Sequence, residues 1–180
     1  MRLSILIVSW NVRQDIVNCV RSIEQDPPQA EFEIIVIDNA SEDGTVEVLR
    51  HDFPQVTLIA NDENHGFAAA NNQGIAGSRG EYVLLLNPDT ILHPHSLDTL
   101  CAFLDGHPDV GACGPRLLNE DGTLQPSAIA GWSCDLMGGV LLYLVSLLTF
   151  SRVRRDKSRT TIRNSAIRLT RYSWWLLFRA

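Results

Sequence analysis

The sequence predicts an α/β fold with a mostly parallel sheet. Short runs rich in Val, Ile and Leu alternate along residues 1–125 with segments whose apolar residues recur at helical spacing. The runs are continuously apolar, which is typical of strands covered on both faces by helices. Strands that alternate with helices form right-handed βαβ units, and these units build a parallel sheet. A length of 180 residues suits one domain with a substantial core.

Five strands and a hairpin are expected in chain order. The first run, Leu3–Ser9, is rich in β-branched residues and too short to be the apolar core of a signal peptide. A hairpin is expected over Leu117–Leu124, because Asp121-Gly122 in its Asn119–Gly122 turn is a strong turn signal. The other expected strands are Glu33–Ile37, Val56–Ala60, Glu81–Leu86 and a short Val110–Cys113.

Four helices are expected between these strands. Asp15–Gln25 carries apolar residues at helical spacing and ends at Asp26-Pro27-Pro28. Pro94 suits the first turn of another helix that runs to about Asp105. The remaining two are Val46–His51 and Gly66–Ala76.

Charge divides the chain near residue 130. Residues 1–150 contain six Arg and twenty Asp or Glu, a net charge of −14, whereas residues 151–180 contain nine Lys or Arg and one Asp, a net charge of +8. We therefore expect a folded domain over residues 1–127. Residues 128–180 are expected to form an atypical tail, apolar and then basic, that is helical or disordered.

The tail has two open interpretations. Its apolar run, Leu136–Phe150, is shorter than the roughly 20 residues of a usual membrane-spanning helix. The basic residues after it, and the aromatic residues Trp174, Trp175 and Phe178, favour contact of residues 136–180 with an anionic membrane surface. Packing against a domain absent from this chain, or disorder, explains the same composition. Nucleic acid is not an expected partner.

Cysteine usage indicates a reducing compartment. The four cysteines show no metal-ligand spacing and are expected to be buried free thiols. We therefore expect a cytoplasmic protein whose tail is a candidate for peripheral attachment to the inner face of the cell membrane. The cysteines are Cys19, Cys101, Cys113 and Cys134.

Polar residues follow each of the first four expected strands. Because ligands of open α/β sheets bind at the carboxyl ends of the strands, we expect these residues to meet at one edge. The candidates are Ser9, Asn11, Asp38, Asn39, Gly66, Asn71, Asn87 and Asp89.

Three of these residues suit a nucleotide and a metal ion. Asp38 is placed to accept a hydrogen bond from the imide N–H of a pyrimidine base. Gly66 lets the backbone approach a ligand closely, and the helix after it points its first amides at the site. Asp89 offers a hard oxygen ligand for Mg²⁺ or Mn²⁺ bridging two phosphates. Each residue also has a purely structural interpretation, as a helix cap, a turn residue or a helix-surface residue.

Together these segments resemble the family 2 glycosyltransferases of GT-A fold. The likeness is strongest to the rhamnosyltransferase-like branch, in which Asn-Pro-Asp replaces the commoner Asp-x-Asp. It covers residues 3 to about 127 and implies binding of a nucleoside-diphosphate sugar, dTDP-rhamnose or a UDP-sugar, with Mg²⁺ or Mn²⁺. The matching segments are Ile7–Asn11, Val36–Thr45, Asn64–Gly74 and Leu86–Asp89.

The resemblance also implies an inverting transfer to a cell-surface polysaccharide or lipid-linked acceptor. Asp38 would bind the base, Asn87 would lie by the ribose, and Asp89 would hold the metal on the diphosphate. In the family a carboxylate in the second half of the domain takes the proton from the acceptor hydroxyl. We find no such base, since the only acid after Asp135 is Asp156, set among arginines. We therefore expect a donor-binding half, from a truncated gene product or a fragment, that transfers sugar poorly.

Other classes predict different features. The main alternative is a truncated, non-catalytic nucleotide-sugar-binding or membrane-associated module, which would bind a donor without transfer. A nucleotidyltransferase needs a Gly-rich loop after the first strand, and Trp10–Gln14 contains no Gly. A dinucleotide-dependent dehydrogenase needs G-x-G-x-x-G at that point, which is absent. His93 and His95 are expected to be exposed polar residues rather than metal ligands.

Overall fold

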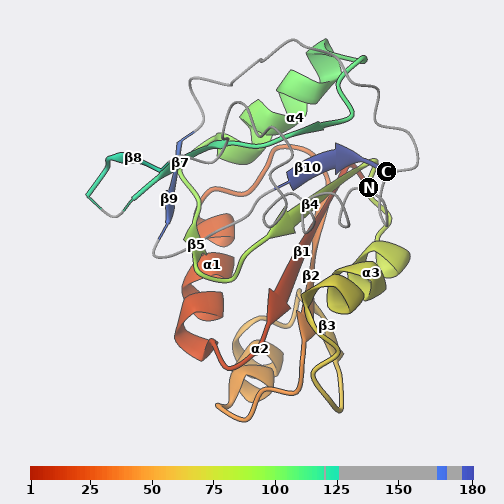
Figure 1. The fold of residues 1–180 in the computed structure, drawn as a ribbon, viewed down its shortest axis with the longest axis vertical. Coiled ribbons are helices and arrows are strands. Elements are labelled where there is room, and N and C mark those ends of the chain that lie inside the picture. The colour runs from red at the N-terminus through yellow and green to blue at the C-terminus, as the bar shows by residue number, and fades with distance from the viewer. Residues whose placement is uncertain (120, 126–165, 170–175) are drawn as a thin grey trace, which may run out of the picture. The chain divides into compact units, whose positions relative to one another are not determined.

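The main sheet has six strands in the order β3-β2-β1-β4-β10-β6 (Figure 1). The computed structural model describes residues 1–119, 121–125, 166–169 and 176–180, all of which belong to one unit. Strands β1 to β4 run parallel to one another, which confirms the expected mostly parallel sheet. The strand bounds are β1 Leu3–Ser9, β2 Phe32–Asp38, β3 Thr57–Ala60, β4 Tyr82–Leu86, β6 Ala112–Cys113 and β10 Leu176–Arg179.

Different helices cover the two faces of the sheet. Leu3, Ile5 and Ile7 of β1 lie in one hydrophobic cluster with residues of α1 and α4. On the other face a Cβ atom added to Gly74 of α3 would lie 3.2 Å from Leu6 Cδ1. Alternate residues of a strand point to opposite faces, so both faces of β1 are buried, as its continuous apolar run predicts. The helices are α1 Arg13–Gln25, α2 Thr45–Asp52, α3 Phe67–Gly77 and α4 Ser96–Gly106.

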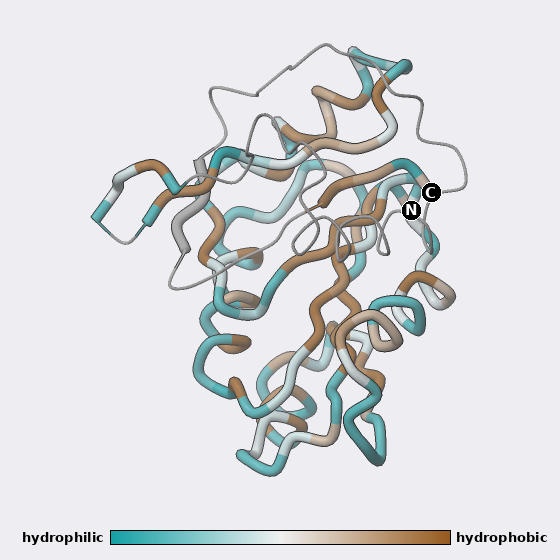
Figure 2. The backbone as a smooth tube through the Cα atoms, viewed as in Figure 1, coloured by the Kyte–Doolittle hydropathy of each residue, from teal (hydrophilic) through white to brown (hydrophobic). Residues whose placement is uncertain are grey.

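Polarity separates the core of the sheet from its carboxyl edge. The central strands are hydrophobic along their length, whereas the loops that follow β2 and β3 are hydrophilic (Figure 2). Three of the four cysteines lie in the described residues and are free thiols: Cys19 and Cys101 are buried, and Cys113 is partly buried. Cys134 lies outside the described residues.

The start of α4 differs from the sequence expectation. Pro94 lies before the helix and not in its first turn, so this prediction was wrong. His95 is the N-cap residue with φ +61°, and the helix begins at Ser96, whose N–H donates to the His93 carbonyl at 3.2 Å. The physical reason is a turn over residues 93–96, which redirects the chain between Pro94 and the helix.

A second, four-stranded sheet has the order β5-β9-β7-β8. Its β7–β8 pair confirms the expected hairpin, since the Asn119 N–H donates to the Thr123 carbonyl at 2.9 Å and Gly122 has φ +81°. The short strand after Asp89 was not expected. The bounds are β5 Thr90–Ile91, β7 Arg116–Leu118, β8 Leu124–Gln125 and β9 Ala166–Leu169.

Strand β10 comes from the end of the chain and pairs antiparallel with both β4 and β6. Leu177 and Phe178 are buried in the sheet, and the Ala180 N–H donates to the Glu81 carbonyl at 2.9 Å. The described tail residues therefore form strands β9 and β10, where the sequence led us to expect a helix or disorder. Phe178 packs in the core and is not an exposed aromatic of an interfacial segment.

The rest of the expected tail, including Leu136–Phe150 and the arginines after it, lies outside the described residues. Within the part of the chain that the structure describes, no helix is both long and apolar enough to cross a bilayer.

Candidate functional site

The ends of β1 and β2 are joined through a buried carboxylate. Ser9 and Asp38 are register partners, so their side chains lie side by side on one face of the sheet. The Ser9 hydroxyl donates to Asp38 Oδ1 at 2.8 Å. Ser41 donates twice to the same carboxylate, from its backbone N–H at 2.8 Å and from its hydroxyl at 2.6 Å. Asp38 is 0% exposed, and its oxygens bind the protein's own loops.

Asn11 makes a second link between the same two loops. Its backbone N–H donates to the Ser41 hydroxyl, and its Oδ1 accepts the Glu42 N–H, both at 2.8 Å. Asn11 has φ +53° and Ala40 has φ +60°. Positive φ costs a residue such as alanine about 1–2 kcal/mol, whereas asparagine adopts it more readily, so the hydrogen bonds of Asp38 and Asn11 hold a strained Ala40 in place.

Asp43 fixes the far end of the β2 loop to the start of α1. Its carboxylate accepts the Arg13 N–H at 2.9 Å and the Thr45 hydroxyl at 2.6 Å. Burial raises the pKa of Asp43, but the hydrogen bonds from Thr45 and Arg13 outweigh it and hold the pKa below its ordinary value. Asp43 is therefore ionised at neutral pH and links the β2 loop to the start of α1.

A network of amide side chains joins β2 to α3. The buried Asn39 accepts a hydrogen bond from Asn61 Nδ2 at 2.9 Å. Asn61 and Gln73 exchange two further hydrogen bonds, at 2.9 and 3.1 Å. The sequence analysis did not single out Asn61 or Gln73 individually, although Gln73 lies in a segment that carries the family resemblance. The available signal for Asn61 was a polar residue directly after the expected strand Val56–Ala60.

The start of α3 depends on Gly66. Its φ of +82° favours glycine, although the position that a Cβ atom would occupy is open within 4 Å. Phe67, the next residue, is 54% exposed. Asn71 is buried, and its Nδ2 donates to the Phe67 carbonyl at 2.9 Å, so this side chain is used within its own helix.

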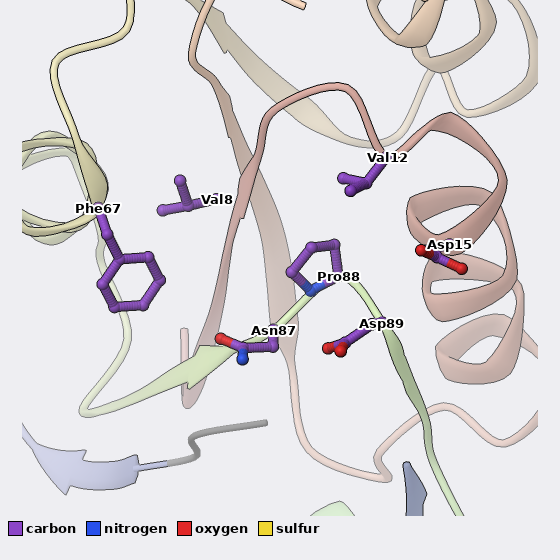
Figure 3. A pocket seen from close by; sticks show the side chains of 7 residues that line it. All are labelled: Val8, Val12, Asp15, Phe67, Asn87, Pro88 and Asp89. Atoms are coloured by element: carbon purple, nitrogen blue, oxygen red, sulfur yellow. The ribbon is translucent and has the colours of Figure 1, made fainter. Parts of the chain in front are cut away.

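A cavity of about 360 Å³ lies at the carboxyl end of β4. Asn87, Pro88 and Asp89 reach it from the turn after β4, and Phe67 reaches it from α3 (Figure 3). Val8 at the end of β1, and Val12 and Asp15 at the start of α1, complete the lining.

The structure thus divides the predicted site residues into two groups. Asn87 and Asp89 line the cavity, and Gly66 directly precedes one of its lining residues. The others are not among its lining residues, and their side chains make the loop and helix contacts described above. They are Ser9, Asn11, Asp38, Asn39 and Asn71. Asp15 was missed, and its place as the acidic residue in the first turn of α1 was the available signal.

The cavity suits a divalent cation held jointly with a phosphate ligand. Two carboxylates, Asp15 and Asp89, line it. Among the described residues no group of three or more His, Cys, Asp or Glu side chains forms a complete metal cage. Mg²⁺ is usually bound through one or two carboxylates together with substrate phosphates. The residues present therefore fit a cation that arrives with, or is completed by, a diphosphate.

Relatives of known sequence match more than half of the chain. A glycosyltransferase of Haemophilus influenzae is 29% identical over 108 residues, which cover 60% of this chain and 36% of that protein. The N-acetylglucosaminyl-diphospho-decaprenol L-rhamnosyltransferase of Mycobacterium tuberculosis is 34% identical over 106 residues, covering 53% of this chain and 34% of that protein. The chain therefore spans about a third of the length of these relatives.

Solved structures share the fold. A mannosyltransferase from Pyrobaculum calidifontis, in complex with GDP-Man and Mn²⁺, matches 64% of this chain and 36% of that chain at 27% identity, with a TM-score of 0.58. Residues 1–349 of TarS from Staphylococcus aureus, in complex with UDP-GlcNAc, match 70% of this chain and 37% of that chain at 23% identity, with a TM-score of 0.61. The second likeness supports the fold alone. The expected GT-A fold is confirmed.

The sequence model of one family covers nearly the whole chain. The model described as "Glycosyl transferase family 2" matches residues 4–174. With the GT-A fold, the carboxylate at the end of β4 and the relatives above, this match identifies the family: the chain belongs to glycosyl transferase family 2.

Proposed function

We propose that this chain binds a nucleoside-diphosphate sugar together with Mg²⁺ or Mn²⁺ at the carboxyl edge of its parallel sheet. It would form the donor half of an inverting transferase that acts on a cell-surface polysaccharide or lipid-linked acceptor. The observation that carries the proposal is the cavity at the end of β4, which Asn87 and Asp89 line together. Ligands of open α/β sheets bind at this edge.

Three of the cavity residues have chemical roles in this proposal. Asp89 would hold the cation, which would supply positive charge to stabilise the departing diphosphate. Asn87 would lie by the ribose. Phe67, which lines the cavity and is 54% exposed, offers an aromatic face to the base or the sugar.

The remaining predicted residues stabilise the loops and the helix that carry the site. Ser9, Asn11 and Asn39 hold the loops after β1 and β2, and Gly66 and Asn71 shape the first turn of α3. Direct contact between Asp38 and the base stays a prediction. Asp38 is 0% exposed and already accepts three hydrogen bonds from Ser9 and Ser41, so this contact requires the β2 loop to move and uncover the carboxylate.

The relatives support the donor class. One is named as an L-rhamnosyltransferase, and one solved neighbour holds GDP-Man with Mn²⁺. On this basis we propose dTDP-rhamnose or a UDP-sugar as the donor, with either metal. The alternative is a module that binds the donor without transfer. The carboxylates of the cavity favour this alternative. Asp89 is assigned to the metal, which leaves Asp15 as the only other carboxylate among the described residues that line the cavity.

Metal-dependent donor binding is the first test. Calorimetry with UDP and with dTDP should show binding that Mn²⁺ strengthens, and Asp89→Ala should abolish this Mn²⁺-dependent gain, because a hard oxygen ligand is lost. Asp121→Ala is the matched control, since Asp121 is an aspartate in the β7–β8 turn that does not line the cavity. Equal affinity for the nucleotide in Mn²⁺ and in EDTA would contradict the proposed metal site.

Transfer is tested separately from binding. The chain is incubated with the candidate nucleotide sugar, Mn²⁺ and a polyprenyl-diphosphate-linked acceptor, and the product is measured. We expect slow transfer, because general-base assistance contributes roughly 10²–10⁴-fold to the rate of such steps and no base is assigned in this chain. Efficient turnover that Asp156→Asn abolishes would show that the tail carries the base.

A further inference from the structure

One face of α1 runs alongside the segment that carries Asp89. Cys19 and Ser22 are three residues apart and lie on one side of the helix, and Asp26 is the residue directly after its end. They contact successive points of the segment from Asn87 to His95, in the same order. The contacts therefore form a row along the helix, with Asp89 between the first and the second.

The first contact in this row is made by a buried thiol. Cys19 is 0% exposed, and its Sγ lies 3.7 Å from the Asn87 carbonyl oxygen, to which it donates. Burial raises the pKa of the Cys19 thiol, and a backbone hydrogen bond from Thr90 opposes this only in part. The thiol therefore keeps its proton at neutral pH and remains a donor.

The second contact passes through a buried hydroxyl. Ser22 Oγ donates to the Cys19 carbonyl within the helix at 2.7 Å and accepts the Leu92 N–H at 3.1 Å. Ser22 is only 6% exposed. Without the hydroxyl the Leu92 N–H would lose its acceptor in a place that excludes water, which is unfavourable for the bound position of that segment.

Asp89 lies between these two attachment points, with Asn87 fixed two residues before it and Leu92 fixed three residues after it. Holding the segment at both ends limits the positions that the Asp89 carboxylate can reach. Groups that hydrogen-bond directly to a metal ligand set its orientation, and their loss typically weakens metal binding by about 10- to 100-fold. Cys19 and Ser22 act one step further away, on the backbone that carries Asp89.

We propose that Cys19 and Ser22 are positioning residues, which hold the Asn87–Leu92 segment against α1 and so set the direction of the Asp89 carboxylate. The inference rests on the proposed function, in which Asp89 binds the cation. It assigns to α1 a role in metal affinity, with no contact between either residue and the metal or the nucleotide.

The test compares Mn²⁺ affinity with nucleotide affinity in Ser22→Ala. Electron paramagnetic resonance, with saturating UDP, measures the free Mn²⁺ concentration at half occupancy. We expect this concentration to rise about tenfold, while UDP affinity in EDTA stays the same. Ser78→Ala is the matched control. The Ser78 hydroxyl also donates to a carbonyl three residues earlier, at 2.8 Å in α3, and it does not touch the Asn87–Leu92 segment.

The outcomes separate this inference from the proposed function. If the wild-type protein binds no Mn²⁺ with UDP, the proposed function fails and the inference fails with it. If the wild type binds and Ser22→Ala has the same midpoint, only the inference is overturned. Should Ser22→Ala not fold, as judged by thermal unfolding, Cys19→Ala carries the test, and an unchanged Mn²⁺ midpoint in that variant also overturns the inference.

Discussion

The carboxylate of Asp38 joins two loops that each contain a residue with positive φ, Asn11 and Ala40. It is fully buried and accepts hydrogen bonds from Ser9 and twice from Ser41. A carboxylate in this setting has a structural task whether or not a nucleotide is bound. Its removal is expected to affect the folded state before it affects recognition of a base.

Asp38→Ala should therefore lower the free energy of unfolding by about 3 kcal/mol, because hydrogen bonds to a charged group are lost and buried donors are left without partners. Urea denaturation measures this change. Ser9→Ala should cost less, and the double variant should cost less than the sum, since both changes remove the same contact. A fully stable Asp38→Ala whose UDP binding falls by about 1.5–3 kcal/mol would instead support direct recognition of the base.

At the scale of elements, the turn that leads from α3 into β4 is packed tightly against the start of β1. Ser4 Oγ accepts the Gly80 N–H at 2.8 Å and donates to Glu33 Oε1 at 2.6 Å. A Cβ atom on Gly80 would lie 2.5 Å from the Ser4 backbone nitrogen. Backbone atoms of a central strand cannot move aside, so only glycine allows this approach.

Gly80→Ala should accordingly destabilise the protein by about 1–3 kcal/mol through overpacking. Gly77→Ala is the matched control, because nothing lies within 4 Å of the position of its Cβ atom. Thermal unfolding of the two variants is the measurement. Equal melting temperatures would show that β4 and β1 can separate at this point without cost.

Across the whole molecule, several carboxylates have pKa values below their ordinary range. Burial raises the pKa of Glu33, but hydrogen bonds from Ser4 and Arg79 outweigh it, so the net pKa is lowered. The pKa of Asp105 is lowered by hydrogen bonds from Tyr82 and Arg2, and that of Asp121 by Thr123. A lowered folded-state pKa contributes stability that is present above the unfolded-state pKa and is lost as the pH falls through the folded-state value.

The protein should therefore lose stability below about pH 4, where carboxylates of ordinary pKa become protonated. Glu33→Gln should lower the unfolding free energy at pH 7 by about 1–2 kcal/mol and should weaken the dependence on pH between 5 and 3. Urea denaturation over that range measures both effects. Glu63→Gln is the control, since the Glu63 side chain is 80% exposed. An identical pH dependence in the two variants would contradict the role of Glu33.

The central part of the fold could be predicted from local sequence. The apolar run Leu3–Ser9 has the same bounds in the structure as in the prediction, because a strand buried on both faces needs a continuous apolar stretch. The turn Asn87–Asp89 was expected at the carboxyl edge, and Asn87 and Asp89 line the cavity there. The order of strands and helices along the chain was enough to predict both the first strand and the position of this turn.

Pairing between distant parts of the chain decided the remaining features of the fold and of the site. The sequence by itself determined the parallel α/β core and the set of polar residues at its carboxyl edge, since both depend on spacing within short segments. Only the tertiary structure placed Leu176–Arg179 between β4 and β6, and only the register of β1 on β2 turned Asp38 toward Ser9. Such contacts join residues far apart in the chain, and their stability comes from burial in a shared sheet, so no local pattern could predict them.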